Sequence, residues 1–226
     1  MNGALTVTLK SKILQYIANR SHEYVWTPVD FIHFGNRDAI DKVLQRLVRS
    51  QELRRIDRGL YDQPRVNLLT GQVNAPDYRK VIDAISRRDQ VRVLIDGMTC
   101  ANDLGLTNAV PGQVIIHTDA QLRPVQLDKL TIKFKLTSPS KLYWANRPAM
   151  RIVQALYWLH DELNNDNKIE QDAIKNKLIQ LLTMPVQGTE ISDDLQKGLH
   201  TLPSWMQLWV RELLVQAGYT ITGTSE

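Results

Sequence analysis

The region from Trp26 to Arg65 constrains the fold of this chain more than any other, because its pattern suits few architectures. Thr27-Pro28 favours the start of a helix, since threonine caps helices well and proline suits the first helical position. Gly35-Asn36 interrupts that helix, and Arg58-Gly59 predicts a tight turn because glycine adopts a positive φ readily. The expected elements are a short helix opened by Thr27-Pro28, a helix over Arg37–Ser50, and strands over Glu52–Asp57 and Leu60–Gln63. This order predicts a compact winged helix-turn-helix, the shape of a DNA-binding domain.

The second helix of this region is amphipathic. Successive residues advance about 100° around a helix, which places one apolar face on Ile40, Val43, Leu44, Leu47 and Val48. The opposite stripe carries Asp38, Lys42, Gln45 and Arg49, and it is flanked by Arg37 and Arg46. An α-helix fits the major groove of B-DNA, where Arg, Lys and Gln read base edges. An ordinary helix with a solvated charged face has the same pattern, and the strands and turns around it favour DNA binding.

In helix-turn-helix proteins, the N-terminal part of this helix usually lies deepest in the groove. That rule nominates Asn36, Arg37, Asp38, Asp41, Lys42 and Gln45 as DNA-contacting residues. The carboxylates of Asp38 and Asp41 repel phosphates, so their expected role is to accept from cytosine N4 or to hold neighbouring side chains in place.

Four arginines lie on or near the predicted strands: Arg54, Arg55, Arg58 and Arg65. Wings commonly touch phosphates or the minor groove, and arginine suits both contacts. The alternative is that these arginines only solubilise an exposed hairpin. The DNA-binding interpretation extends the candidate site to Arg46, Arg49, Arg54, Arg55 and Arg58.

Charge is unevenly distributed along the 226 residues. Residues 1–65 carry 11 Lys and Arg against 7 Asp and Glu, residues 66–160 carry 12 against 7, and residues 161–226 carry 5 against 10. A basic body suits a polyanionic partner.

No apolar run approaches the roughly 20 residues that span a bilayer, and the single cysteine excludes an intramolecular disulfide. We therefore expect a cytoplasmic protein that does not associate with membranes.

The rest of the chain predicts a second domain. A helix is expected over Leu9–Ala18, ahead of the winged region, and residues 66–76 read as a linker or an edge turn because they contain glycine, asparagine and proline. The later expected elements are a helix over Asp77–Arg88, strands over 90–95, 113–118 and 125–136, a short helix over 96–104, and helices over 150–161, 169–183 and 203–217. The predicted fold class is α+β, with a winged helix-turn-helix domain over 1–66 and a mixed α+β domain over 77–226 that is helical after about residue 147.

No catalytic or metal-binding pattern is recognisable. The chain has no phosphate-binding glycine loop, and its histidines, including His22, show no metal-ligand spacing. Cys100 lacks the surroundings of a nucleophile and is expected to be a buried structural thiol. Asp193-Asp194 is expected to start a helix, and Trp144 is expected in a core or an interface. We predict neither enzymatic activity nor a cofactor.

Three stretches resemble the AbiEi-type antitoxins of type IV toxin–antitoxin systems: Thr27–Phe31, Ala39–Val48 and Leu53–Tyr61. In that family, a helix of paired apolar residues leads into a short strand, an Arg-Gly turn and an aromatic residue. The resemblance covers residues 25–65 well, and residues 77–160 match only in the order of elements. It implies a repressor of its own operon that binds inverted repeats, and DNA contacts by Lys42, Arg46, Arg49, Arg54, Arg55 and Arg58.

The partners implied by this resemblance are double-stranded DNA from the protein's own promoter and a nucleotidyltransferase-like toxin. A homodimer on DNA would match an inverted repeat by symmetry. Two alternatives remain open: a transcription factor unrelated to toxins, with a ligand-sensing or dimerisation domain, and a protein-interaction module whose winged domain binds protein.

Overall fold

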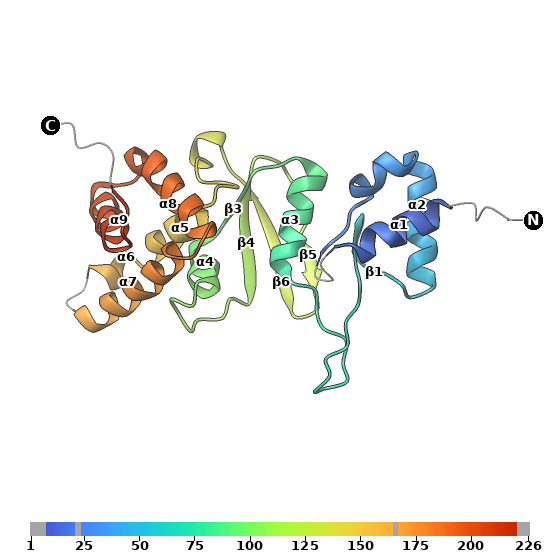
Figure 1. Cartoon of the computed structure of the whole chain (residues 1–226), viewed down its shortest axis with the longest axis horizontal. Helices are drawn as coiled ribbons and strands as arrows, with labels where there is room; N and C mark the ends of the chain where they lie inside the picture. Colours follow the sequence, from blue (N-terminus) through green and yellow to red (C-terminus); the bar gives the residue numbers. More distant parts are fainter. Residues whose placement is uncertain (1–7, 21–23, 165–166, 221–226) are drawn as a thin grey trace, which may run out of the picture. The chain divides into compact units, whose positions relative to one another are not determined.

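The computed structural model describes residues 8–20, 24–164 and 167–220, and the chain divides into two compact units (Figure 1). The first unit comprises Met1–Val91 with Pro124–Ile132, and the second comprises Arg92–Arg123 with Lys133–Glu226. The fold is mixed α+β, as predicted. The units have other bounds than the predicted domains 1–66 and 77–226, because residues 77–91 and 124–132 group with the N-terminal elements.

Three helical segments build the core of the first unit. They are α1 (Leu9–Ala18), the 3-10 helix η1 (Pro28–Phe34) and α2 (Arg37–Arg49). Their apolar faces meet in one cluster, in which the side chains with no more than 2% exposure include Ile13, Ile17, Trp26, Phe31, Ile40, Leu44, Leu47 and Leu53. The predicted bounds of α1 and α2 are confirmed to within one residue, because the period of buried residues defines both helices locally.

Two short antiparallel strands follow α2: β1 (Arg54–Asp57) and β2 (Leu60–Asp62). Both are shorter than predicted, and the turn between them contains Gly59 at a φ of 70°. Trp26 and Tyr61 exchange two main-chain hydrogen bonds of 2.7 and 2.9 Å. This pair fastens the β1–β2 hairpin to the segment that leads into η1.

Residues 66–76, predicted as a linker or an edge turn, continue as a second projection from the first unit. Val66 and Val73 form an isolated antiparallel bridge, so the segment is a small hairpin, drawn as the long loop at the bottom of Figure 1. Helix α3 (Tyr78–Asp89) follows and is capped by Asp77, whose carboxylate accepts a hydrogen bond from the Arg79 amide at 2.9 Å. Helix α3 contacts β2 and so packs beside the first hairpin.

The remaining strands form a four-stranded sheet of order β3-β4-β6-β5. Their bounds are β3 (Val93–Ile95), β4 (Gln113–Thr118), β5 (Val125–Leu127) and β6 (Leu130–Leu136). Strands β3 and β4 pair antiparallel, and so do β5 and β6. Helix α4 (Gly97–Asp103) follows β3 and is capped by Asp96, whose carboxylate accepts hydrogen bonds from the Thr99 amide and hydroxyl.

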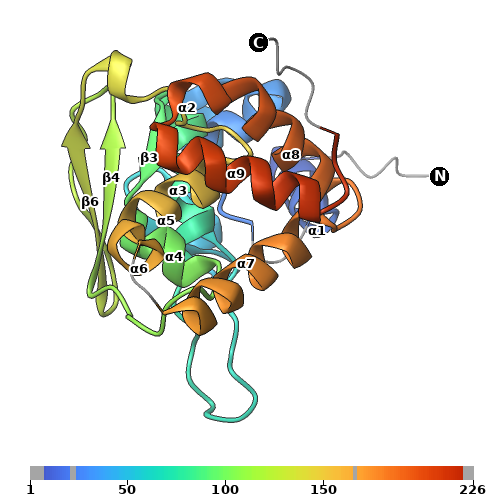
Figure 2. The same cartoon turned by 90° about the vertical axis from the view of Figure 1, so that its left-hand side faces the viewer.

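Helices dominate the C-terminal part of the second unit, as the periodicity predicts (Figure 2). Their bounds are η2 (Pro139–Lys141), α5 (Met150–Trp158), α6 (His160–Leu163), α7 (Lys168–Leu182), α8 (Gln187–Gly198), η3 (Leu199–Thr201) and α9 (Ser204–Gln216). Helix α5 packs against α4 and contacts β3. No helix within residues 8–20, 24–164 and 167–220 is long and apolar enough to cross a membrane.

The expectation that Asp193-Asp194 starts a helix is wrong, because both residues lie within α8. Asp194 is buried, and its carboxylate accepts hydrogen bonds from Arg147 at 2.6 and 2.9 Å and from the Ala149 amide at 3.0 Å. Helix α8 therefore packs on the start of α5 through a charged pair. At its end, a Cβ on Gly198 would overlap the ring of Trp144, which is buried as predicted.

Candidate nucleic-acid interface

Helix α2 is held by its apolar face, and its opposite face is exposed. Ile40, Leu44 and Leu47 are fully buried in the cluster of the first unit. The Asn36 side chain accepts a hydrogen bond from the Ala39 amide at 2.9 Å, which caps the helix and fixes where it begins. Because the helix is anchored on one side, the direction of its other side chains is set by the fold.

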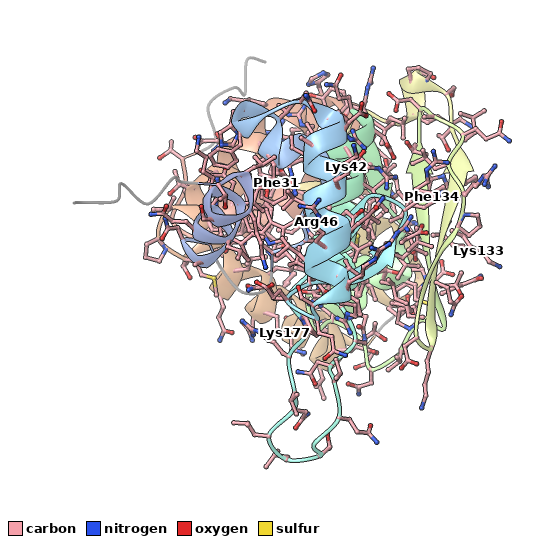
Figure 3. All side chains as sticks on the ribbon, turned by 90° about the vertical axis from the view of Figure 1, so that its right-hand side faces the viewer. Phe31, Lys42, Arg46, Lys133, Phe134 and Lys177 are labelled. Atoms are coloured by element: carbon pink, nitrogen blue, oxygen red, sulfur yellow. The ribbon has the colours of Figure 1, made fainter. Side chains whose placement is uncertain are left out.

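Four polar side chains of α2 point away from this core: Lys42, Gln45, Arg46 and Arg49. In the described part of the chain, none of these side chains forms a hydrogen bond or ion pair. Figure 3 shows Lys42 and Arg46 on the side of α2 that faces the viewer. Three unpaired cations and one amide thus share a single helix face. The predicted stripe also included Asp38 and was flanked by Arg37.

The N-terminal turns of α2 carry a mixed set of charges. Arg37 forms an ion pair with Asp41, with Nε and Oδ2 2.9 Å apart, and Asp38 is exposed. The Asp41 carboxylate therefore binds Arg37. One role predicted for Asp41 was to hold the side chains of Lys42 and Gln45. The surface is therefore most positive along Lys42, Arg46 and Arg49.

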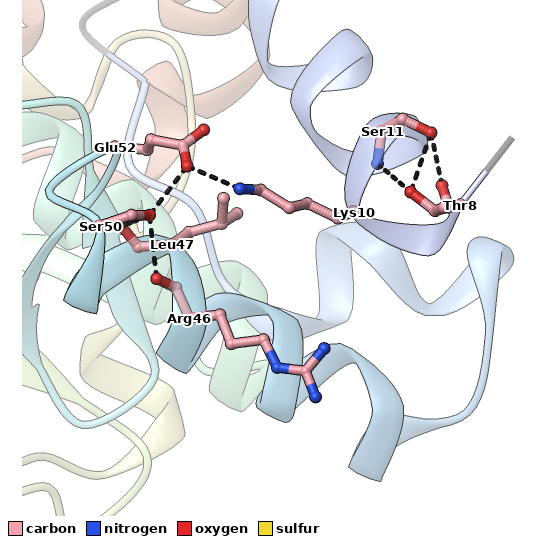
Figure 4. A network of polar contacts seen from close by, with 7 residues as sticks. All are labelled: Thr8, Lys10, Ser11, Arg46, Leu47, Ser50 and Glu52. Atoms are coloured by element: carbon pink, nitrogen blue, oxygen red, sulfur yellow. Dashed lines mark hydrogen bonds and ion pairs between the residues drawn. The ribbon is translucent and has the colours of Figure 1, made fainter.

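A polar network holds the C-terminal end of α2 against α1 (Figure 4). Lys10 binds the carboxylate of Glu52 at 2.8 Å, and the hydroxyl of Ser50 donates to the same carboxylate at 2.8 Å. The Ser50 hydroxyl also lies 3.0 Å from the main-chain carbonyl of Arg46, while the guanidinium of Arg46 points away from the network. Hydrogen bonds from Lys10 and Ser50 lower the pKa of Glu52.

The arginines of the β1–β2 hairpin differ in their surroundings. Arg54 donates two hydrogen bonds to Asp62, at 2.9 and 2.5 Å, and a third to the carbonyl of Asn74 at 2.8 Å. Its guanidinium is thus engaged within the first unit, which gives Arg54 a structural role beside its predicted contact with DNA. Arg55 is exposed, and its Nε lies 3.4 Å from the carbonyl of Asp57.

Arg55 of β1 pairs across the hairpin with Tyr61 of β2, whose side chain is buried. Burial raises the pKa of Tyr61, and this is the largest effect; the positive charges of Arg55 and Arg37 lower the pKa, and the negative charge of Asp41 raises it. Strand β1 and the first turns of α2 therefore present their charged groups around one buried tyrosine.

The turn of the hairpin is held by α3, a contact that sequence patterns do not reveal. Arg88 donates a hydrogen bond of 2.6 Å to the carbonyl of Arg58, and it chelates Asp89 at 2.7 and 2.8 Å. A Cβ at Gly59 would lie 3.6 Å from the Cδ of Arg88, so the turn and the arginine side chain are in close contact. The side chain of Arg58 is exposed.

Arg87, the neighbour of Arg88, fastens α3 to the segment before η1. Its guanidinium donates to the carbonyl of Val25 at 2.9 Å, lies 3.5 Å from the Asp30 carboxylate, and sits 4.6 Å from the ring centre of Tyr24. The one feature of the sequence that could have indicated these contacts is the Arg87-Arg88 pair in the last turn of a predicted helix. Such a pair is usual at helix C-termini, so the contact partners could not be inferred from it.

Comparison with known proteins adds a family. The sequence profile described as "Family of unknown function (DUF6088)" matches residues 12–184, which is most of the chain. The chain belongs to this family. No curated protein matches it. Among solved structures, this DUF6088 member is similar to the RV2827C protein from Mycobacterium tuberculosis, with 16% identity, a TM-score of 0.41, and coverage of 93% of this chain and 78% of the other.

The DUF6088 match extends from α1 to the end of α7 and so includes elements of both units. Among the residues that the structure describes, no three His, Cys, Asp or Glu side chains are grouped as metal ligands. Cys100 is fully buried, as predicted, and burial raises the pKa of its thiol. His22 lies outside the described residues.

Proposed function

We propose that this protein is a DNA-binding transcriptional autorepressor and the antitoxin of a type IV, AbiE-like toxin–antitoxin system. In this proposal α1, η1 and α2 with the β1–β2 hairpin are a winged helix-turn-helix, and α2 is its recognition helix. The observation that carries the proposal is the exposed face of α2, where Lys42, Arg46 and Arg49 lack partners in the described chain.

The proposed contacts follow from the chemistry of each side chain. Arg46 and Arg49 neutralise phosphates along the groove, while Lys42 and Gln45 reach base edges. The exposed guanidinium groups of Arg55 and Arg58 bind the backbone beside the helix. Asn36 and Asp41 act inside the protein, as a helix cap and as the partner of Arg37.

The antitoxin role rests on the resemblance of residues 25–65 to AbiEi-type antitoxins. In this proposal the second unit counters a nucleotidyltransferase-like toxin, and the protein represses the operon that encodes both. Co-expression tests this part: the full chain should restore growth to cells that produce a toxin from the neighbouring gene. If growth arrest persists although the full chain is stable and folded, the antitoxin role is rejected and the alternative of a transcription factor unrelated to toxins is favoured.

DNA binding is tested with the pure protein and its own upstream DNA at two salt concentrations, with random DNA for comparison. The variant Lys42→Ala/Arg46→Ala removes two charges from α2, and Lys168→Ala/Lys197→Ala removes two exposed charges from helices of the second unit. Selective binding should weaken as the salt concentration rises. The logarithm of the association constant should fall linearly with the logarithm of the salt concentration, with a slope of about 0.9 per neutralised phosphate. The α2 variant should lose most of the binding and the control variant should keep it.

Absence of binding by the wild type at low salt would reject the proposal. Equal losses in the two variants would also reject it, because a general effect of net charge would then explain the binding.

A further inference from the structure

The outer face of α9 carries an aligned set of apolar side chains. Leu208 is 70% exposed and Val215 is 60% exposed, while Trp205 and Trp209 are partly buried one helical turn apart. At about 100° per residue, the four side chains fall within about 120° of one another around the helix. Figure 2 shows α9, in red, in front of the other helices of the second unit. These four residues are named the α9 stripe.

The direction of the α9 stripe is fixed by the opposite face of the helix. The side chains with 0% exposure on that face are Met206, Val210, Leu213 and Leu214. Helix α7 runs beside α9: Lys175 forms an ion pair of 2.7 Å with Glu212, and the Tyr219 hydroxyl donates to the Leu182 carbonyl at 2.8 Å. Both pairs are 37 residues apart, so the two helices run parallel in one register. This register places the Trp205 end of α9 beside the first turn of α7.

The Trp205 end of the stripe lies against the most acidic part of the chain. The rings of Trp205 and His160 have their centres 4.6 Å apart, which places α6 beside this end. Residues 160–172 hold five Asp and Glu against one Lys, and we name them the acidic segment. The side chain of Asp161 is 99% exposed, and Glu170 and Asp172 are exposed on α7. Apolar and negatively charged groups therefore share one surface of the second unit.

This combination has the composition of a protein interface. Tryptophan is enriched among the residues that carry most of the binding energy, and such residues are surrounded by a polar rim. Exposed apolar residues that are scattered singly need no explanation, whereas an aligned group with a charged border marks a contact site. The ammonium of Lys175 lies 5.0 Å from the ring centre of Trp209, but its charge is balanced by Glu212. The border of the stripe therefore remains negative.

We propose that the α9 stripe and the acidic segment bind a basic amphipathic helix of another protein. The apolar face of that helix packs on the tryptophan and leucine side chains, and its Lys and Arg side chains meet the carboxylates. Amphipathic helices bind apolar surfaces in this way through residues spaced at i, i+3, i+4 and i+7. The inference concerns the second unit and does not depend on DNA binding by α2.

Charge selects this partner over two others. Carboxylates repel the phosphates of a nucleic acid, so the acidic segment disfavours DNA at this surface. A second copy of the chain would bring residues 161–226, with 5 Lys and Arg against 10 Asp and Glu, against the same region of its partner, which like-charge repulsion opposes. A cationic helix gains attraction where both of these would meet repulsion.

The probe is a fluorescently labelled synthetic peptide of about 18 residues, long enough to form a helix on binding, with leucines on one face and lysines elsewhere. A peptide of the same composition in scrambled order lacks the apolar face, and a leucine–glutamate peptide keeps that face with the opposite charge. Fluorescence anisotropy with the full chain measures affinity. The wild type should prefer the leucine–lysine helix over both. Because the whole chain carries a net charge of +4, nonspecific attraction would not favour this peptide.

Two pairs of variants locate the binding. Leu208→Ser/Val215→Ser removes the exposed part of the α9 stripe, and Val110→Ser/Leu136→Ser removes two exposed apolar side chains elsewhere in the same unit. The stripe variant should bind more weakly by a factor on the order of ten or more, and the control should bind as the wild type does.

The second pair tests charge. Asp161→Asn/Glu170→Gln should weaken binding and reduce its dependence on salt, whereas Glu190→Gln/Asp193→Asn on α8 should change neither.

Equal affinity for the scrambled peptide or the leucine–glutamate peptide would overturn the inference, and so would unchanged binding by the folded stripe variant. If the stripe variant unfolds, Leu208→Lys decides, since it keeps Val215 and places a like charge against the peptide. A wild-type dimer that the stripe variant loses would show that a second copy covers the stripe, and would also overturn the inference. None of these measurements contains DNA, so their outcome leaves the repressor proposal to its own test.

Discussion

The guanidinium of Arg88 donates a hydrogen bond of 2.6 Å to the main-chain carbonyl of Arg58, thirty residues earlier in the chain. This bond joins the last turn of α3 to the turn of the β1–β2 hairpin. The position of the Arg58 backbone therefore depends on a helix that lies outside the predicted winged region of residues 1–66.

Replacement of Arg88 by alanine should loosen that turn. We expect the free energy of unfolding to fall by about 1–2 kcal/mol, because a charged hydrogen bond is lost and Asp89 loses its partner. DNA affinity should fall as well, since the backbone that carries Arg58 is then less restrained. Urea unfolding and DNA titration measure the two effects, with Lys80→Ala on the same helix as control. An Arg88→Ala protein as stable as the control would contradict this role.

Two positions on α2 should separate affinity from base preference. Arg46→Ala should weaken binding to all sequences and reduce the magnitude of the salt slope by about 1, as expected for one phosphate contact. Gln45→Ala should leave the slope unchanged and alter the preference at one base pair by about 1–3 kcal/mol. Titrations of single-base operator variants at several salt concentrations measure both quantities. Identical behaviour of the two variants would refute this division of roles.

Arg54 and Arg55 are sequence neighbours, and they should respond differently to substitution. Arg54→Ala leaves the buried Asp62 carboxylate without its guanidinium and should lower the free energy of unfolding by about 1–3 kcal/mol, the cost of a buried acceptor left without its donor. Arg55→Ala affects an exposed side chain and should change it by less than about 0.5 kcal/mol. Denaturant unfolding of both variants tests this, and similar stability losses would be inconsistent with the structure.

The network at the C-terminal end of α2 should give stability an acid dependence. The pKa of Glu52 is lowered from its ordinary value of 4.5, chiefly by the hydrogen bond from Lys10 and then by that from Ser50. A lowered pKa means that the stabilisation is present above pH 4.5 and is lost as the pH falls through the folded-state value. The stability gap between wild type and Glu52→Gln should therefore narrow on acidification. The exposed Glu190→Gln serves as control, and a gap that does not change with pH would argue against the network.

Cys100 should report unfolding directly. It is the single cysteine of the chain, its side chain is fully buried, and burial raises the pKa of its thiol. The native protein should therefore react slowly with a thiol reagent at neutral pH, at a rate set by opening of the fold, and quickly in urea. A fast native reaction would show that the thiol is accessible.

The features predicted most accurately from the sequence are those that depend on local periodicity, namely the bounds of a helix and the residues on its exposed face. Helix α2 starts and ends within one residue of its expected bounds, and its exposed face carries the expected side chains, because both follow from the burial of Ile40, Leu44 and Leu47. The pairing of Arg54 with Asp62 was missed, since it requires the register of β1 against β2. Nothing in the order of residues separates Arg54 from Arg55 before that register is known.

The start of helix α8 was misplaced for a related reason. Its packing depends on distant groups: Gly198 makes room for Trp144, and Asp194 is satisfied by Arg147, 47 residues earlier. Within its own segment, Asp193-Asp194 looks like a polar helix start, because the partner that makes burial of a carboxylate tolerable lies in another part of the unit. The hairpin over residues 66–73 was expected as a linker or an edge turn, since glycine and asparagine mark turns of every kind.

Arg54 holds both projections of the first unit with one planar group, because Asp62 belongs to the β1–β2 hairpin and Asn74 to the base of the hairpin over residues 66–73. Neither projection can swing independently without breaking bonds to this guanidinium. The hairpin over residues 66–73 and the strand that carries Arg55 are therefore restrained by the same side chain.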